Sequence, residues 1–396
     1  MRGWDNMTDE IFRHDGYTFE FEANVISAES DRVILDSTAF YPGGGGQVCD
    51  TGFIRGNPVT EVFYDGNTIV HKVPKHDLKP GERVWCSVDW DRRYDLMQGH
   101  TGEHLLFCSL KRQCPDLEIT KIYISPESKY VIVNHDLEWS QIREAVRFAN
   151  KAIKDNLPVT KSIMDRDDPD LSKVRIKLDR IGENEEITVV AIGDIDLSAC
   201  SGVHVMETSE LEMLLVDRKV SSGKDGIAIH FKIGDAAKNA AADMTALAME
   251  IVDTIGCKTE DAPKAVSNMK HQAESNAIAL KNAMKSIVSS MVPESVNGTE
   301  VYSAMLPIAE KTVISEKAES VKSSGGVAGF VTNSASVMLA SGNKAVDCKK
   351  ILSEVLPLFG GRGGGKPDFA QGGIADASDA EKALKSLTDA VKQSLN

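Results

Sequence analysis

Apolar and polar positions alternate along the N-terminal part of the chain, which is the period of a half-buried β-strand. The alternation is regular over residues 17–25 (YTFEFEANV), and shorter strand-like runs follow at 32–36, 60–64 and 84–88. Gly and Asn residues separate these runs, as expected for turns. The pattern predicts a small β-barrel over residues 1–90.

Helical and strand-like patterns are mixed in the next part of the chain. Residues 92–110 and 139–156 have the spacing of helices. The strand-like runs are residues 129–133, 186–192 and 227–231. We therefore expect an α+β domain over residues 91–233.

The composition changes after this domain. From Ala236 the chain is rich in Ala, Met, Lys and Glu, and its apolar residues recur every three or four positions. Gly256 breaks the pattern, and Pro263 marks the start of a second helix. We expect residues 234–293 to form an antiparallel helical hairpin whose Ala/Met stripe is a packing seam.

A last unit is predicted over residues 294–396. Its strand-like and helical runs alternate, which predicts an α/β domain. The strands are expected at 301–306, 326–331 and 335–340, and the helices at 349–356 and 378–394. Between the helices lies the glycine-rich segment 359–373, FGGRGGGKPDFAQGG. The fold class expected for the whole chain is α+β.

Two pairs of metal-binding residue types lie about a hundred positions apart. His100 and His104 in HTGEH are four apart on a predicted helix, so both imidazoles can face one ion. Cys200 and His204 in CSGVH follow a predicted strand, and a turn can bring thiolate and imidazole together. Three His and one Cys suit tetrahedral Zn²⁺. The alternative is two unrelated sets of core or surface residues.

The chemistry of such a centre has two interpretations. Four protein ligands are typical of a closed structural zinc site. Catalysis requires one ligand that yields its position, or a metal that organises the pocket without activating water. Glu103, between the two histidines, and Asp194 are candidates for proton transfer or for contacts to the ligands. Both can equally well be residues that face solvent.

Charge and composition narrow the class of protein. The formal net charge of −14 argues against a chain that coats nucleic acid over its whole surface, but a localised basic groove remains compatible with it. No apolar run reaches the roughly eighteen residues of a membrane span, and MRGWDNMTDE is not a signal peptide. Seven irregularly spaced cysteines do not form a disulfide framework. We expect a cytoplasmic protein without a membrane partner.

Two glycine-rich segments are candidate binding loops. Gly360 and Gly365-Lys366 fit the P-loop spacing, but Pro367 stands where Ser or Thr would ligate Mg²⁺, which excludes nucleotide hydrolysis there. Backbone N–H groups beside Arg362 and Lys366 can instead grip a phosphate backbone, unless the segment is only a flexible capping loop. The segment from Thr38 to Gln47 can bring backbone close to a small ligand.

Several motifs together resemble one known family. HTGEHLL, CSGVHV, TAFYPGGGGQ with DTG, and the lead-in VDWDRRYDLMQGH are similar to the editing domain of alanyl-tRNA synthetases and to the free-standing editing proteins called AlaX. GGRGGGKPDFAQGG is similar to the C-terminal domain of the same family. Because the chain leaves no room for an aminoacylation domain, the resemblance is to the long AlaX form.

The resemblance implies a zinc-dependent aminoacyl-tRNA deacylase. The parts are then a β-barrel, an editing core with zinc (Zn²⁺) held by His100, His104, Cys200 and His204, a hairpin, and a C-terminal domain for tRNA binding and dimerisation. The substrate implied is tRNA(Ala) charged with serine, or with glycine, and the expected assembly is a homodimer. Arg362 and Lys366 are the expected tRNA contacts.

The resemblance also assigns roles near the substrate. Thr38 matches the family's threonine near the substrate and is the candidate contact for the serine hydroxyl, and Gln47 orients substrate or water. A site that hydrogen-bonds this hydroxyl can discriminate by roughly 10⁴–10⁵ against alanine. The family usually has Cys-Gly-Gly-Thr-His where this chain has CSGVH, which keeps both ligands but moves a hydroxyl.

Two other functions are compatible with parts of the pattern. A non-catalytic tRNA-binding protein with zinc as a structural clip is the main alternative, favoured by the four-ligand set and by Val203. A zinc peptidase is disfavoured, because HTGEH has Glu in the fourth position and HExxH metalloproteases have it in the second.

Overall fold

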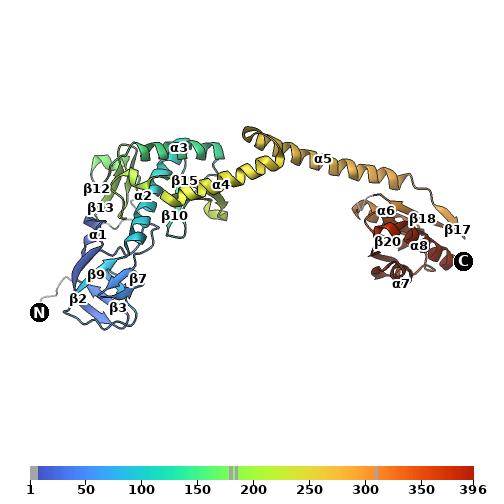
Figure 1. Ribbon diagram of the computed structural model, residues 1–396, viewed down its shortest axis with the longest axis horizontal. Helices are drawn as coiled ribbons and strands as arrows, with labels where there is room; N and C mark the ends of the chain where they lie inside the picture. Colours follow the sequence, from blue (N-terminus) through green and yellow to red (C-terminus); the bar gives the residue numbers. More distant parts are fainter. Residues whose placement is uncertain (1–7, 178–181, 183–185, 308–310) are drawn as a thin grey trace. The chain divides into compact units, whose positions relative to one another are not determined.

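The computed structural model describes residues 8–177, 182, 186–307 and 311–396. The chain divides into two compact units, residues 1–250 (unit 1) and 251–396 (unit 2), whose elements are labelled in Figure 1. Among the described residues, unit 1 contains sheets of seven, four, three and two strands, and unit 2 contains one sheet of six strands. The chain is therefore a mixed α/β protein. The finer division into four domains stays a prediction.

The N-terminal sheet has the strand order β6-β5-β9-β2-β3-β8-β7. Its bounds are β2 Glu20–Glu29, β3 Arg32–Leu35, β5 Gly52–Ile54, β6 Asn57–Val59, β7 Glu61–Asp65, β8 Thr68–Lys72 and β9 Arg83–Val88. Only Thr60 separates the two edge strands in sequence, so the sheet curls until its edges almost meet. The predicted barrel is thus present as a nearly closed sheet.

The alternation that predicted this sheet is visible in its burial. Along β2 the residues from Glu20 to Val25 alternate between exposed and buried. The buried side chains form one core with Phe12 of helix α1 (Ile11–His14). A short parallel pair, β1 (Asp9–Glu10) with β4 (Ser37–Thr38), closes this end of the unit.

Two helices cover a four-stranded sheet in the second half of unit 1. Helix α2 (Trp90–Gln113) begins where Asp89 accepts a hydrogen bond from the N–H of Arg92. It packs against α3 (Trp139–Lys154), and both bury apolar side chains on the sheet β10-β11-β16-β15. The bounds are β10 Ile119–Ile124, β11 Lys129–Val133, β15 Leu214–Ser221 and β16 Ile227–Ile233.

A three-stranded antiparallel sheet delivers the second ligand pair. Its strands are β12 (Val159–Met164), β13 (Ile187–Ile192) and β14 (Asp196–Ala199). Val189 of β13 pairs with Ala199 of β14, and the Cys200 N–H donates to the Thr188 carbonyl. The residue after β14 is therefore held in place by the sheet.

Two long helices follow where the apolar spacing predicted them. They are α4 (Gly234–Ile255) and α5 (Ala262–Ser289). Gly256 ends the first helix with a φ of 71°, and Pro263 lies in the first turn of the second. Each helix lies mainly in a different unit, and their pairing as a hairpin stays a prediction. Of the described helices, none is both long and apolar enough to cross a membrane.

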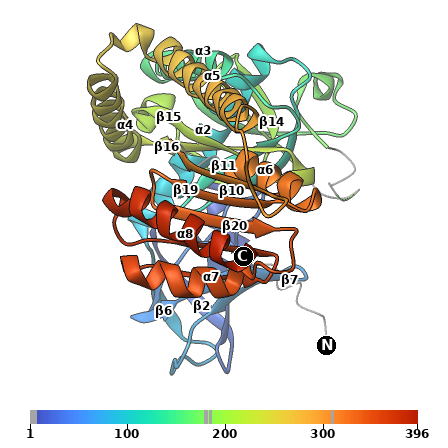
Figure 2. The same ribbon diagram turned by 90° about the vertical axis from the view of Figure 1, so that its right-hand side faces the viewer.

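Unit 2 has helices on both faces of its sheet. The order is β17-β18-β19-β20-β22-β21, with bounds β17 Glu294–Val296, β18 Thr299–Leu306, β19 Val327–Thr332, β20 Ser336–Ser341, β21 Arg362–Lys366 and β22 Phe369–Gly373. Helices α7 (Cys348–Val355) and α8 (Ala380–Leu395) lie side by side on one face (Figure 2). Helix α6 (Lys311–Ser323) packs on the other.

The glycine-rich segment is a β-hairpin, and the expectation of a loop there was wrong. Strands β21 and β22 pair from Arg362–Gly373 to Lys366–Phe369. A Cβ at Gly363 or at Gly372 would lie 2.6 or 2.5 Å from the Leu356 Cδ1 atom. Glycine is therefore required where the hairpin lies against the end of α7, although its low strand propensity hides the strands from a sequence pattern.

Candidate metal centre

Helix α2 and the segment after β14 bring the two ligand pairs together. One donor atom from each of His100, His104, Cys200 and His204 lies within 4.8 Å of all the others. The Cys200 Sγ is 3.3 Å from the His100 Nε2 and 3.4 Å from the His204 Nε2. A tetrahedral zinc with its usual bond lengths would hold sulfur and nitrogen about 3.5 Å apart. The donor set therefore fits a zinc-sized cation.

Each histidine of the cluster is oriented through its other ring nitrogen. The Nδ1 of His100 is 2.7 Å from the Gln47 Oε1. The Nδ1 of His104 is 3.1 Å from an Asp196 carboxylate oxygen, and that of His204 is 3.2 Å from the Thr101 hydroxyl. These contacts leave the three Nε2 atoms available for a metal. Metal-binding histidines are usually oriented in this way, by a hydrogen bond from the ring nitrogen that does not bind the metal.

Close packing around His100 requires glycine on one side. A Cβ at Gly202 would overlap the His100 ring, and one at Gly45 would lie 3.8 Å from it. The ring is therefore enclosed between the CSGVH segment and the glycine loop that carries Gln47. Ser201 of that segment is exposed, whereas Val203 is buried in the core of the N-terminal sheet. Val203, which replaces the threonine usual in the family motif, thus packs in this core.

The cluster perturbs its own acid–base equilibria. Burial would raise the pKa of the Cys200 thiol, but the nearby His100 and His204 outweigh burial and hold this pKa far below its usual range. Burial would lower the pKa of His104, but its hydrogen bonds to Asp196 and Cys200 raise the pKa to about 10. Burial, with the charge of His100, lowers the pKa of His204 to about 3. These shifts favour the thiolate form of Cys200 and the protonated form of His104 when no metal is bound.

Metal affinity is expected to rise with pH. Because the raised pKa keeps His104 protonated, metal binding must displace the proton on its Nε2 while Nδ1 keeps its hydrogen bond to Asp196. One displaced proton makes the affinity rise about tenfold per pH unit between roughly pH 6 and 9. Titration with Zn²⁺ against a competing chelator measures this slope, and an affinity independent of pH would contradict it.

Two polar groups beside the cluster have no hydrogen-bond partner among the described residues. Neither carboxylate oxygen of Glu103 has one, although this side chain is fully buried and lies 3.8 Å from the His104 Nε2. The Gln47 Nε2 is likewise buried without a partner, while its Oε1 bonds to His100. A buried carboxylate and a buried amide donor left unsatisfied are costly, so they mark a place where water or substrate can bind.

Thr38 lies in the core of the N-terminal sheet with its hydroxyl already bonded. Its Oγ1 is 2.8 Å from the His71 Nε2 and accepts from the Phe40 N–H at 3.2 Å. The His71 Nδ1 faces the Val33 carbonyl at 3.1 Å, so Nδ1 carries the proton and Nε2 accepts from Thr38. Burial lowers the pKa of His71 to about 4, which keeps this ring neutral. Thr38 can therefore meet a further polar group only as an acceptor.

The structure separates the two acidic candidates. Asp194 lies exposed in the turn between β13 and β14, whereas Glu103 faces the cluster. A second carboxylate, that of Asp196 two residues on, is within hydrogen-bond distance of the His104 Nδ1. The sequence reasoning missed Asp196, together with Thr101 and His71. The available signal was the position of Asp196 at the start of the strand that leads to Cys200.

Arg362 and Lys366 belong to the other unit. Both are exposed at the ends of β21, and neither has an ion pair among the described residues. Nearby Asp368 is bound by Lys322 at 3.3 Å, which leaves the Lys366 ammonium available. These cations are open to an anionic partner.

Two families match parts of the sequence. Residues 7–92 match the family described as tRNA synthetases class II (A), and residues 301–393 match the DHHA1 domain. One relative is the alanyl-tRNA editing protein AlaX-L of Pyrococcus horikoshii, which is 27% identical over 93% of this chain and 95% of its own length. The chain resembles the long form of AlaX. The resemblance spans both units.

Synthetases are similar to the chain over a smaller share of their length. The alanine–tRNA ligase of Methanoregula boonei is 30% identical over 95% of this chain but only 43% of its own length. The ligase of Methanocorpusculum labreanum is 28% identical, again over 95% and 43%. The chain thus spans less than half of these relatives. The solved C-Ala domain of Aquifex aeolicus alanyl-tRNA synthetase is 22% identical with a TM-score of 0.23, and the match covers 26% of this chain and 99% of that domain.

Proposed function

We propose that this chain is a trans-editing deacylase that hydrolyses mischarged tRNA(Ala), chiefly Ser-tRNA(Ala), to free amino acid and tRNA. The Pyrococcus horikoshii relative, which matches almost the whole of this chain, is named an alanyl-tRNA editing protein. The observation that carries the proposal is the convergence of three histidine Nε2 atoms and one thiol beside a buried carboxylate that has no hydrogen-bond partner among the described residues. Gly-tRNA(Ala) is a second substrate of the same proposal.

The cofactor in this proposal is Zn²⁺, held by His100, His104, Cys200 and His204. When bound, it would polarise the ester carbonyl or position the attacking water. Histidine and thiolate donors suit zinc better than the oxygen-preferring Mg²⁺ or Ca²⁺. Partial exposure of Cys200 and His204 leaves this side of the cluster open to a substrate.

The chain's own residues would then carry the proton transfers. Glu103 takes a proton from the water that attacks the ester carbon, because its carboxylate is buried and accepts no hydrogen bond from the described residues. The Gln47 amide donates a hydrogen bond to the carbonyl oxygen as negative charge develops there. The proton on Glu103 then passes to the ribose oxygen as the ester bond breaks. Asp194 remains a weaker candidate for the same role.

Selectivity for serine is assigned to Thr38. Because its hydroxyl proton is committed to His71, its Oγ1 can only accept, and a serine hydroxyl is a donor that alanine lacks. Thr38 has no solvent exposure, so substrate binding must open its surroundings or share its bond with the Phe40 N–H. A polar contact of this kind discriminates where side-chain size cannot.

Replacing Thr38 with Val is expected to reduce the ratio of seryl to alanyl hydrolysis by roughly 10–100-fold. Valine keeps the shape but removes the acceptor, which costs about as much as an unpaired buried polar group. Single-turnover deacylation of the two esters measures the ratio. Ser37→Ala is the matched control, because its hydroxyl bonds only to Asp36 among the described residues. An unchanged ratio in Thr38→Val would remove Thr38 from substrate recognition.

The proposed activity is tested by deacylation of Ser-, Gly- and Ala-tRNA(Ala) with and without a chelator. We expect rapid loss of the seryl ester, little loss of the alanyl ester, and inhibition by the chelator that Zn²⁺ restores. If the metal-loaded protein leaves the seryl ester intact while an editing-competent alanyl-tRNA synthetase clears it, the proposal fails.

A non-catalytic tRNA-binding protein with a structural zinc is the second candidate. The four-ligand set, which leaves no position free by itself, favours it. In either case tRNA(Ala) is the proposed partner, the cytoplasm is the proposed location, and Arg362 and Lys366 are proposed phosphate contacts. The homodimer stays a prediction that light scattering can test.

A further inference from the structure

One face of the unit 2 sheet is open beside helix α6. This helix packs on β19 and β20 through apolar residues such as Ile314 and Val321. Strands β22 and β21 continue the sheet beyond it, and α7 contacts them within the cluster on the opposite face. All residues of β21, from Arg362 to Lys366, are exposed. The end of the sheet therefore presents a bare surface next to α6.

The strand register shows which side chains share this surface. Phe330 pairs with Met338, Met338 with Gln371, and Gln371 with Gly364. Residues directly opposite each other project to the same face of a sheet, so this row runs from the helix-covered core to the open edge. A Cβ at Gly364 would meet nothing within 4 Å. We call the surface of Met338, Gln371 and Gly364 the glycine face.

Positive charge flanks the glycine face. Arg362 and Lys366 lie two residues to either side of Gly364, and residues two apart on a strand point to the same side. Neither makes an ion pair among the described residues. Two cations therefore border a stretch of backbone that carries no side chain.

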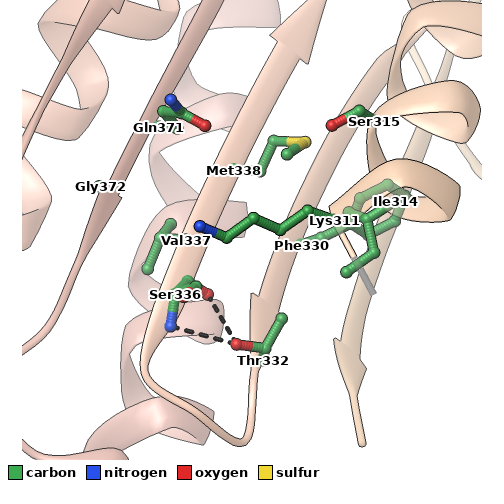
Figure 3. A pocket seen from close by; sticks show the side chains of 10 residues that line it. All are labelled: Lys311, Ile314, Ser315, Phe330, Thr332, Ser336, Val337, Met338, Gln371 and Gly372. Atoms are coloured by element: carbon green, nitrogen blue, oxygen red, sulfur yellow. Dashed lines mark hydrogen bonds between the residues drawn. The ribbon is translucent and has the colours of Figure 1, made fainter. Parts of the chain in front are cut away.

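A cavity of about 400 Å³ adjoins the glycine face, within the usual range for small ligands. Phe330 and Met338 form its apolar part, and Ser315 and Gln371 add polar groups. Figure 3 shows the Lys311 side chain extending from α6 across the cavity. The Thr332 hydroxyl is occupied by the Ser336 N–H. The side chains of Ser315, Gln371 and Lys311 have no hydrogen bond or ion pair among the described residues, so they can contact a ligand.

We propose that the glycine face and this cavity together hold one unstacked nucleobase of tRNA. The ring lies against Met338 and the Gly364 backbone, the Gln371 amide contacts its polar edge, and Lys311, Arg362 and Lys366 hold the flanking phosphates. Proteins commonly hold unpaired bases of RNA by stacking the ring on an aromatic or guanidinium plane, with cations on the backbone. Here the Met338 thioether and the bare backbone at Gly364 take the place of that plane. The inference rests on the proposed function, because it takes tRNA as the partner.

The replacement Gly364→Val tests the glycine face without disturbing the fold. Valine suits a strand, and the position has open space and no left-handed φ. Its side chain would lift a ring off the backbone, so we expect the full-length protein to bind tRNA(Ala) at least about tenfold more weakly. The dependence of affinity on salt should not change, because no phosphate contact is lost.

Lys311→Ala is expected to differ in its salt dependence. Removing one phosphate contact lowers the slope of log affinity against log salt by about 0.7–0.9. Lys385→Ala is the matched control, since this exposed lysine lies on α8, which covers the opposite face. The control should leave affinity and slope unchanged. Melting temperatures of the variants verify that all of them fold.

The inference is overturned if Gly364→Val binds tRNA(Ala) as tightly as the wild-type chain. It is also overturned if Lys311→Ala and Lys385→Ala change the salt dependence equally. Hydrolysis of a seryl acceptor-stem RNA tests the deacylase activity apart from the base site. The short RNA lacks the rest of the tRNA, so Gly364→Val should cleave it as fast as the wild-type chain does. Absence of hydrolysis by the wild-type chain would refute the deacylase, while the binding comparison still decides the base site.

Discussion

Replacing Cys200 with Ala is expected to reduce seryl-tRNA(Ala) hydrolysis by at least about 100-fold while tRNA affinity changes by less than about twofold. The thiolate lies at 3.3 and 3.4 Å from two of the histidine donors, and its negative charge is the only one the four ligands supply. Without it, three neutral imidazoles must hold a divalent cation alone. We expect zinc content to fall with the activity.

Fold and activity can be measured separately in this variant. The three tryptophans at described positions, 85, 90 and 139, lie in unit 1, and no tryptophan occurs in the sequence after residue 139. Their fluorescence therefore reports the fold of the unit that holds the cluster. A catalytic centre predicts a native fluorescence spectrum with lost hydrolysis, whereas a structural clip predicts unfolding. Cys257→Ala, which changes a free thiol in unit 2, should retain both properties.

The candidate site could be predicted from sequence to the extent that its residues stand in short motifs. HTGEH and CSGVH contain the four donors because helix and turn geometry bring positions four apart to one side. The contacts that orient these donors are not in the motifs. Asp196 and Gln47 reach His104 and His100 only through the tertiary fold, which no spacing rule reveals.

The fold was predictable where apolar periodicity is strong and unpredictable where glycine replaces it. The alternation of apolar residues in β2 and their helical spacing in α2 predicted the ends of these two elements to within a few residues. Hairpin β21–β22 was missed, because glycines such as Gly363 and Gly372, which allow the close approach to Leu356, interrupt the apolar pattern of its strands. The same absence of side chains produces the open surface on the opposite face of that hairpin.

Replacing Asp50 with Ala is expected to destabilise unit 1 by about 3–5 kcal/mol, the usual cost of leaving one member of a buried ion pair unpaired. Asp50 and Arg93 are both fully buried and joined by hydrogen bonds from the guanidinium. Arg93 also donates to the carbonyls of Gly16 and Ala39, and Asp50 accepts from the Tyr41 N–H at 2.6 Å. The pair therefore ties α2 to the segments that carry Thr38 and the glycine loop.

A surface pair of the same residue types provides the control for Asp50. Asp77 binds Arg55, but 84% of the Asp77 side chain is exposed, so Asp77→Ala should cost no more than about 1 kcal/mol. Urea unfolding followed by tryptophan fluorescence reports unit 1 for both variants. Equal losses would show that burial of the Asp50–Arg93 pair is not what fixes these segments. A large loss in Asp50→Ala alone would mean that the loop bearing Gln47 is held in position against His100 by a charge pair outside the metal cluster.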